Sequence, residues 1–193
     1  MPYSSEMAVL SGLRPGERLL WSGRPDERAL FIPADGFLIP FGLFFLCFSV
    51  VWTTQAANGA PAFFPIFGSL FIAIGLYYVF GRFFVKVWRK RRSFYAVTDR
   101  RAFAVEGSTV TDTPIVGVGR TVSRSRQNRL ISVVFATGRS ATWNPISGGN
   151  RMPLNSGLDG FMYQRPLAFF DVRDGDGLLR ALDEAESIQL RSR

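Results

Sequence analysis

The sequence predicts an α+β membrane protein, in which a two-helix transmembrane hairpin is followed by an antiparallel β-barrel or sandwich with a C-terminal α-helix. Three observations lead to this class. No Asp, Glu, Lys or Arg occurs between residues 36 and 81. Short segments with alternating apolar residues follow that stretch. One segment near the C-terminus has the apolar spacing of an amphipathic helix.

Two apolar runs divide the uncharged stretch. They cover residues 37–54 and 62–81, and the polar residues 55–61 separate them. A helix that spans a bilayer needs about 20 residues, with a range of roughly 17 to 25. Both runs are apolar on every face, whereas a core helix of a soluble protein usually keeps a polar stripe. We therefore predict two transmembrane helices joined by an external loop at 55–61.

Two glycines in the second run, Gly68 and Gly75, lie two turns apart on a similar face. Small residues at this spacing let membrane helices approach closely. The alternative is that both glycines face lipid and have no role. The sequence leaves both readings open.

The charges that flank the two runs predict their orientation. The N-terminal segment, residues 1–36, carries four arginines, and the basic juxtamembrane segment, residues 82–92, follows the second run. The loop between the runs has no charge. Because Lys and Arg accumulate on the cytoplasmic side, both termini should be cytoplasmic, and the protein should be a multi-pass protein of the inner membrane.

Residues 93–193 are predicted to form a cytoplasmic β-rich domain. The clearest hairpin comprises 93–98 and 101–107. Further strands are expected within 108–125 (broken near Thr113 and Pro114), 129–137, 141–143 and 165–172. Residues 145–160 are rich in Gly, Pro, Asn and Ser, which is typical of a long loop. A helix is expected at about 176–188, with Asp174 or Asp176 as its N-cap.

Residue types exclude several chemistries. The chain has no histidine and one cysteine, Cys47. This excludes a disulfide within the chain, a Cys/His zinc site and a His-based catalytic triad. The glycines at 117–119 lack the third glycine of a dinucleotide fingerprint, and residues 171–177 do not place calcium ligands at the spacing of an EF-hand loop. We therefore predict no enzyme activity, and assign no catalytic residue, cofactor or metal ligand.

Three stretches, together with the pair of apolar runs, resemble a known family. They are LRPGERLLWSGRPDE at 13–27, FYAVTDRRAFAVEG at 94–107 and FFDVRDGDGLLRALDEA at 169–185. In this order they are similar to bacterial membrane proteins with a pleckstrin-homology-like (PH-like) domain. The resemblance implies a PH-like fold for residues 93–193 and brings no catalytic residues. It implies a non-enzymatic module that binds a protein partner or anionic lipid at the cytoplasmic membrane face. The alternative is an accessory subunit of a membrane complex that contacts other membrane proteins through its spans.

Two basic clusters are candidate binding residues. The juxtamembrane cluster consists of Arg82, Lys86, Arg89, Lys90, Arg91 and Arg92. Basic residues near a membrane attract anionic lipid by about 1 kcal/mol each, but the same residues also set topology. The second cluster, a basic edge around a predicted turn, consists of Arg120, Arg124, Arg126 and Arg129. The resemblance implies that this edge binds lipid or peptide, and the alternative is a solvated edge strand that resists aggregation. Nucleic acid is disfavoured because no stacking aromatic residues are interleaved with these bases.

Overall fold

The computed structural model describes residues 12–59, 61, 63–125, 130–136, 155–157 and 166–192. The chain forms two compact units. The helical unit comprises Leu30–Lys86 and Pro145–Phe161, and the β unit comprises Met1–Ala29, Val87–Asn144 and Met162–Arg193. The predicted strand at 141–143 lies outside the described residues, as does the 145–160 loop apart from residues 155–157.

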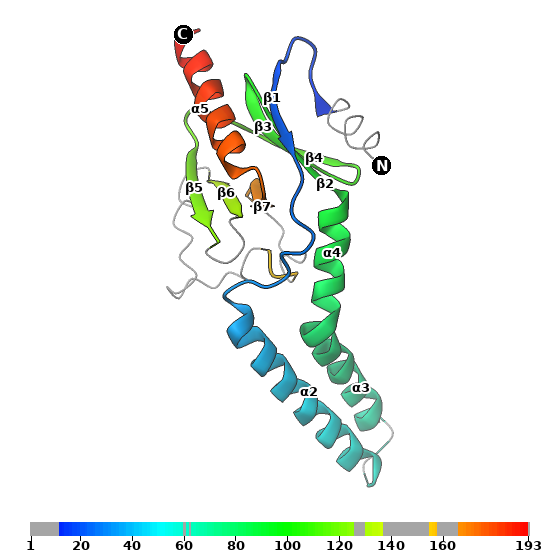
Figure 1. Cartoon of the computed structure of the whole chain (residues 1–193). Coiled ribbons are helices and arrows are strands. Elements are labelled where there is room, and N and C mark those ends of the chain that lie inside the picture. Colours follow the sequence, from blue (N-terminus) through cyan, green and yellow to red (C-terminus); the bar gives the residue numbers. More distant parts are fainter. Residues whose placement is uncertain are drawn as a thin grey trace. The chain divides into compact units, whose positions relative to one another are not determined.

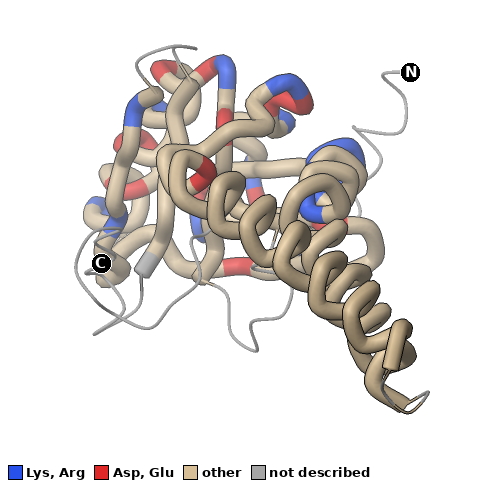
Figure 2. The backbone as a smooth tube through the Cα atoms, turned by 90° about the horizontal axis from the view of Figure 1, so that it is seen from below, with Lys and Arg blue, Asp and Glu red and all other residues tan. Residues whose placement is uncertain are grey.

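Two apolar helices form the body of the helical unit. They are α2 (Asp35–Ala57) and α3 (Phe63–Leu76), which run side by side in opposite directions (Figure 1). Both α2 and the continuous helix Phe63–Arg92 are long and apolar enough to cross a membrane, judged by length and composition. Figure 2 shows no charged position along α3 and none along α2 beyond its first residue. Large apolar side chains such as Phe44 and Phe63 are exposed, so these helices differ from those of a soluble core.

Small residues fill the contact between the two helices. Gly68 and Gly75 are both buried in α3. A Cβ atom at Gly68 would overlap Thr53 Oγ1, and one at Gly75 would lie 3.0 Å from the Cα of Leu46. The close-packing reading of these glycines is therefore confirmed, and the lipid-facing reading is wrong.

The second apolar helix does not end at residue 81. Its α-helical hydrogen bonding changes to a π-helical turn, η1 (Tyr77–Gly81), and then resumes as α4 (Arg82–Arg92). The segment that the sequence assigned to a basic juxtamembrane stretch is thus helical. Turns of this kind inside α-helices are rare and are frequent at functional sites.

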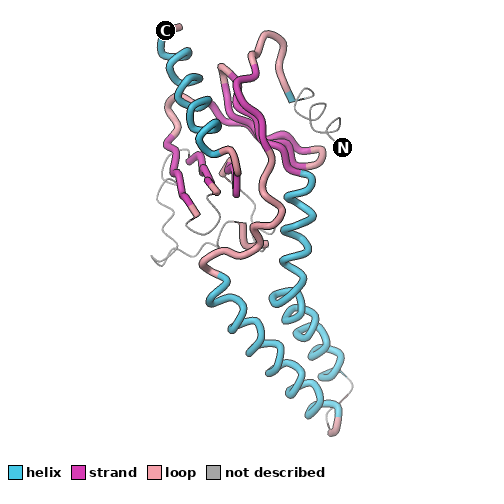
Figure 3. The backbone as a smooth tube through the Cα atoms, in the orientation of Figure 1, coloured by secondary structure: helices cyan, strands magenta, loops and turns pink. Residues whose placement is uncertain are grey.

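Two antiparallel sheets form the β unit (Figure 3). The first has the order β1 (Leu19–Gly23), β2 (Ser93–Thr98), β3 (Arg101–Glu106) and β4 (Thr109–Pro114). The second has the order β5 (Gly119–Arg124), β6 (Ile131–Ala136) and β7 (Ala168–Val172). Within the described residues these sheets are separate, so the predicted barrel is not closed, and two packed sheets replace it.

The predicted hairpin is confirmed, and it gains an unpredicted neighbour. Strand β2 pairs with β3 through Phe94↔Val105 and Tyr95↔Ala104. On its other side β2 pairs with β1, which precedes the apolar runs in the sequence. The sequence predicts residues 1–36 as a separate segment, but Leu19–Gly23 belongs to the first sheet. A strand of five residues with little alternation gives a weak signal in sequence.

The core of the β unit lies between the two sheets and the C-terminal helix α5 (Gly175–Arg191). Phe169 stacks on Tyr95 with ring centroids 4.7 Å apart, and α5 buries Leu178 and Leu182 completely. Burial raises the pKa of the Tyr95 hydroxyl. Asp174 is the N-cap of α5, as one of the two predicted candidates, and its side chain accepts a hydrogen bond from the Gly177 N–H at 3.1 Å.

Candidate functional site

One face of α4 carries three of the six juxtamembrane bases. Arg82, Lys86 and Lys90 are spaced by four residues, which places them in a row along the helix. Their relative exposures are only 0%, 3% and 5%. Lys and Arg are almost never buried without partners. These three side chains therefore do not form part of an open basic surface, and their partners determine what they can do.

In the helical unit, Arg82 pairs with Asp35. Arg82 Nη1 donates to Asp35 Oδ1 at 2.5 Å, and both side chains are buried. Asp35 Oδ2 also accepts from the backbone N–H of Ile32 at 2.7 Å. In the sequence these two charges bracket the uncharged stretch, and in the structure they neutralise one another.

The hydrogen-bonding capacity of Arg82 is only partly used. Its Nε and Nη2 atoms are buried and have no hydrogen-bond partner in the described part of the chain. Lys86, one turn further along, donates to the carbonyl oxygen of Leu30 at 2.5 Å. A buried guanidinium with two nitrogen atoms that have no hydrogen-bond partner is unusual, because each buried donor without a partner costs free energy.

Gly157 lies against the start of α4. The hydroxyl of Tyr77 donates to its carbonyl oxygen at 2.8 Å. Gly157 has a φ of +83°, and a Cβ atom there would overlap the carbonyl oxygen of Arg82. Only glycine combines this backbone conformation with so close an approach. The sequence predicts Gly157 only as part of the long loop at 145–160.

In the β unit, Lys90 connects α4 to the segment 26–29 and to β7 through hydrogen bonds. Its Nζ donates to the carbonyl oxygens of Asp26 and Ala29 at 2.9 and 2.6 Å, and to Asp171 Oδ2 at 2.5 Å. Asp26 in turn pairs with Arg173, whose Nε lies 2.9 Å from Asp26 Oδ2. The hydrogen bonds from Arg173 lower the pKa of Asp26 below its ordinary value.

The other juxtamembrane bases lie nearer the surface of the β unit. Arg89 Nη2 is 3.9 Å from Glu106, and Arg91 Nε donates to Glu27 at 3.1 Å. The guanidinium of Arg92 lies over the ring of Trp88 at 4.1 Å. Arg91, Arg92 and Trp88 are exposed. Contact between this cluster and anionic lipid stays a prediction. The exposed side chains of Trp88, Arg91 and Arg92 are the ones that could make this contact without rearrangement.

Arg120 and Arg124, from the predicted basic edge, lie on β5 and face acids of α5. Arg120 Nη2 is 2.6 Å from Asp183 and 3.5 Å from Glu186, and Arg124 is 3.9 Å from Asp176. Arg126 and Arg129 lie outside the described residues. Opposite charges on a strand and a helix thus reduce the net positive charge of this edge. The only sign of these pairs in the sequence is that Asp176, Asp183 and Glu186 recur at intervals of seven and three residues along the predicted helix.

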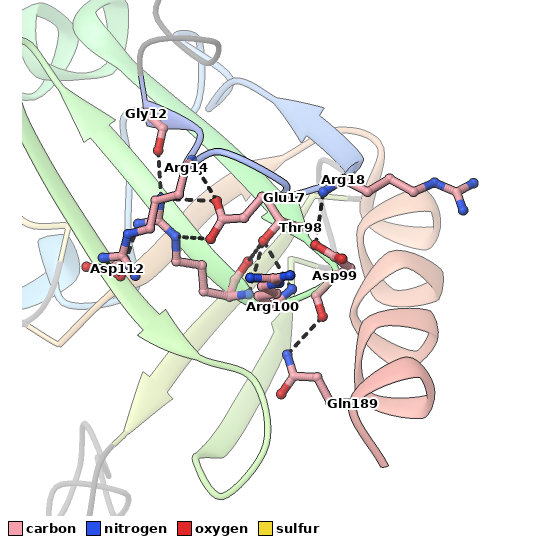
Figure 4. Close-up of polar contacts among 10 residues, drawn as sticks. Gly12, Arg14, Glu17, Arg18, Thr98, Asp99, Arg100, Asp112 and Gln189 are labelled. Atoms are coloured by element: carbon pink, nitrogen blue, oxygen red, sulfur yellow. Dashed lines mark hydrogen bonds and ion pairs between the residues drawn. The ribbon is translucent and has the colours of Figure 1, made fainter. Parts of the chain in front are cut away.

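A further ion pair, which was not predicted from sequence, joins the stretch 13–27 to the β2–β3 hairpin (Figure 4). Arg101 Nε donates to Glu17 Oε1 at 2.8 Å, and its Nη2 donates to the carbonyl oxygen of Gly12 at 2.7 Å. The side chains of Arg101 and Glu17 are 7% and 2% exposed. Burial opposes ionisation of Glu17, but the hydrogen bonds from Arg101 and from the backbone N–H of Arg14 lower its pKa overall.

The turn between β2 and β3 is also stabilised by polar contacts, among them one with Arg18, which lies in the same stretch as Glu17. Thr98 Oγ1 accepts hydrogen bonds from the backbone N–H groups of Arg100 and Arg101 at 3.2 and 3.0 Å. Asp99 Oδ1 accepts from the backbone N–H of Arg18 at 3.0 Å, and its carbonyl oxygen accepts from Gln189 at 3.1 Å (Figure 4). Two of the stretches that carry the family resemblance therefore meet in space, and their polar residues hold the sheet together.

Comparison with family models, with curated proteins and with solved structures found no match for this chain. Among the described residues, no group of three or more His, Cys, Asp or Glu side chains is placed to hold a metal ion. The polar side chains described above form ion pairs and hydrogen bonds that connect segments distant in the sequence.

Proposed function

We propose that this chain is a membrane-anchored, non-enzymatic binding module, in which the two apolar helices span the inner membrane and the β unit stands on the cytoplasmic side. One observation carries the proposal. The strands immediately before and after the helical hairpin, β1 and β2, are neighbours in one sheet, with Ser22 opposite Ala96. A chain that leaves this sheet and returns to it must cross the membrane an even number of times. The basic residues that flank the helices favour the cytoplasm as the common side.

The proposed fold of the β unit is PH-like. Four antiparallel strands, three further antiparallel strands and a C-terminal helix against the core form the same series as in PH domains. The three stretches that resemble the family fall on β1 and its approach, on the β2–β3 hairpin, and on β7 with α5. In this interpretation the membrane hairpin occupies the β1–β2 connection.

A protein segment is the ligand that the geometry of the β unit favours. The described bases of the predicted basic edge face acids, which weakens attraction to an anionic surface. All six residues of β5 are exposed, and its only described sheet neighbour is β6. An exposed edge strand can accept an extended peptide as an additional strand. Anionic lipid is the second candidate, favoured by exposed Arg92 and Trp88.

Anchoring is tested first. The full chain should stay with membranes through high-salt and alkaline washes, because two spans are not extracted by either treatment. Release into the soluble fraction would contradict the proposal.

The binding edge is tested by photo-crosslinking from the full chain in its own cells. A crosslinker at Val122 on β5 should capture a partner, and one at Val110 on β4 serves as the matched control, since both side chains are about equally exposed at 40% and 44%. Capture from Val110 alone would move the contact to the other sheet. Capture only from exposed helix positions such as Phe44 would favour the accessory-subunit alternative.

A further inference from the structure

The described surface of the helical unit stays apolar beyond both ends of the uncharged stretch. Phe31, which precedes Asp35 in the sequence, is 74% exposed, and Phe84, which follows Arg82, is 77% exposed. Exposed apolar surface of this kind marks contact with a membrane or with another protein. We propose that the surface embedded in the bilayer extends to Phe31 and Phe84, so that the Asp35–Arg82 ion pair lies inside the membrane.

The charges at this end of the helical unit are all turned inward. Asp35, Arg82 and Lys86 are the only charged residues in its described part, and all three are buried. Arg82 donates to Asp35, and Lys86 donates to the carbonyl oxygen of Leu30. Ionisable side chains within a membrane almost always face the protein interior and pair with one another or with backbone carbonyls. At a boundary with water, by contrast, long basic side chains keep the charged head in water.

The lengths of the helices place the inner boundary at the same level. Near the far end of the hairpin, Trp52 of α2 and Phe64 of α3 form an edge-to-face pair with ring centroids 6.5 Å apart, and Trp is enriched at membrane interfaces. At about 1.5 Å per residue, the helix rises about 27 Å from Phe64 to Arg82 and about 30 Å to Phe84. Along α2, Asp35 lies about 26 Å from Trp52. Because a hydrocarbon core is about 30 Å thick, a boundary at Phe84 matches a bilayer and leaves the ion pair about 3 Å inside it.

A ring contact holds Phe31 beside the start of α4. The ring of Phe31 lies 5.5 Å from the ring of Phe83, which stands between Arg82 and Phe84 in the sequence. The guanidinium of Arg82 lies over the same Phe83 ring at 4.6 Å. The exposed rings of Phe31 and Phe84 therefore belong to one end of the helical unit, next to the buried ion pair.

Exposed charge returns along α4 at the depth of lipid headgroups. Trp88 is about 6 Å beyond Phe84 along the helix, within a headgroup layer that is about 5–7 Å deep on each side. Arg91 is the first charged residue after Phe84 that is largely exposed, and it lies about 10 Å further along the helix. This inference rests on the proposed membrane anchoring, but not on what the β unit binds.

Nitroxide spin labels measure the depth of single positions in the full chain, reconstituted in vesicles of phosphatidylethanolamine and phosphatidylglycerol. In a Cys47→Ser background, the labels are placed at Phe31→Cys and at Phe84→Cys. Phe44→Cys, at a position of α2 that is 71% exposed, is the lipid reference, and Arg91→Cys is the water reference. Power saturation compares collisions with oxygen, which concentrates in the bilayer, and with a nickel chelate, which stays in water.

The ratio of oxygen to nickel collisions should be several-fold higher at Phe31→Cys and Phe84→Cys than at Arg91→Cys. A water-like ratio at either test position, while Phe44→Cys stays lipid-like, would place the boundary at the ion pair and overturn this inference alone. Protection of both test positions from both reagents would show that protein covers them, which would also overturn it. A water-like ratio at Phe44→Cys would instead contradict the proposed anchoring, and this inference with it.

Discussion

Glu17, which precedes the first apolar helix in the sequence, forms a buried ion pair with Arg101 on β3. The carboxylate accepts from Arg101 and from the Arg14 backbone, and the guanidinium reaches the Gly12 carbonyl. Removing one partner of a buried ion pair typically costs about 3–5 kcal/mol, because the other charge is left without compensation. These residues therefore stabilise the first sheet.

We predict that Glu17→Gln destabilises the β unit by about 1–3 kcal/mol at neutral pH. The loss should be smaller than that for a buried charge left alone, because Arg101 keeps a second carboxylate, Asp112, whose Oδ2 lies 3.0 Å from its Nη1. Chemical unfolding of the full chain in detergent, followed by near-ultraviolet circular dichroism, measures the change. Arg14→Gln is the control, since the Arg14 side chain is 63% exposed and its pair with Asp112 should contribute less than about 1 kcal/mol. Equal losses in both variants would contradict the assignment.

The same carboxylate predicts a pH dependence. The folded-state pKa of Glu17 is lowered, so its contribution to stability is fully present above its unfolded pKa of about 4.3 and is lost as pH falls through the lower folded value. The free energy of unfolding of the native chain should therefore fall between pH 5 and acid pH more steeply than that of Glu17→Gln. Parallel acid profiles for the two proteins would rule out Glu17 as a source of the slope.

The sequence identifies the basic residues that matter, but it does not predict which groups they bind. The bases of α4 and β5 were found as clusters, but burial of Arg82, Lys86 and Lys90 was not anticipated. A run of bases after an apolar stretch is the signal for membrane topology, and the same run at helical spacing can turn one face inward. The acceptors are mainly backbone carbonyls and carboxylates far away in sequence, such as Asp171, and no local pattern reports those contacts.

At the scale of elements, the contact between α2 and α3 depends on residues without side chains. Gly75→Leu should destabilise the packing of the two helices by about 1–3 kcal/mol, because the new side chain would meet Leu46. Ala73→Leu, an exposed neighbour on the same helix, is the matched control. Interhelical distances from spin labels on the two helices, together with thermal unfolding in detergent, report the change. An unchanged distance and midpoint in Gly75→Leu would show that this contact is not tight.

Strand β1 is the element that the sequence missed, and it changes how the β unit must be prepared. A fragment of residues 93–193 lacks β1, so β2 would present an open edge in place of its partner. We predict that this fragment aggregates, whereas residues 12–29 joined by a flexible linker of about ten residues to residues 87–193 stay soluble. Size-exclusion chromatography of both proteins gives the comparison. A monomeric, folded 93–193 fragment would show that β1 is dispensable.

The elements with a strong period were predicted well. Strands β2, β3, β6 and β7 and helix α5 fall where alternation and helical spacing placed them, within a few residues at each end. The division into two sheets was not predictable, because sheet order depends on pairing between segments and each segment alone carries only its own period. For the same reason the sequence favoured a barrel or sandwich without deciding how its strands close.

At the scale of the whole molecule, the pairing of β1 with β2 constrains the topology independently of the charges that flank the helices. The helical hairpin is an insertion between two adjacent strands, so if it spans a membrane as proposed, both of its ends must lie on the same side of that membrane. The charges that flank the helices and the pairing of β1 with β2 are independent observations, and both favour the proposed even number of crossings.

This topology predicts the labelling of single cysteines in intact cells. In a Cys47→Ser background, which leaves no native cysteine, a membrane-impermeant maleimide should label Asn58→Cys, in the turn that follows α2, without permeabilisation. Arg18→Cys and Ser192→Cys, before β1 and after α5, should react only once the membrane is opened. Labelling of Arg18→Cys and Ser192→Cys from opposite sides is incompatible with a single sheet containing β1 and β2. Equal labelling of all three sites in intact cells would place both helices outside the bilayer and remove the anchor on which the proposed function depends.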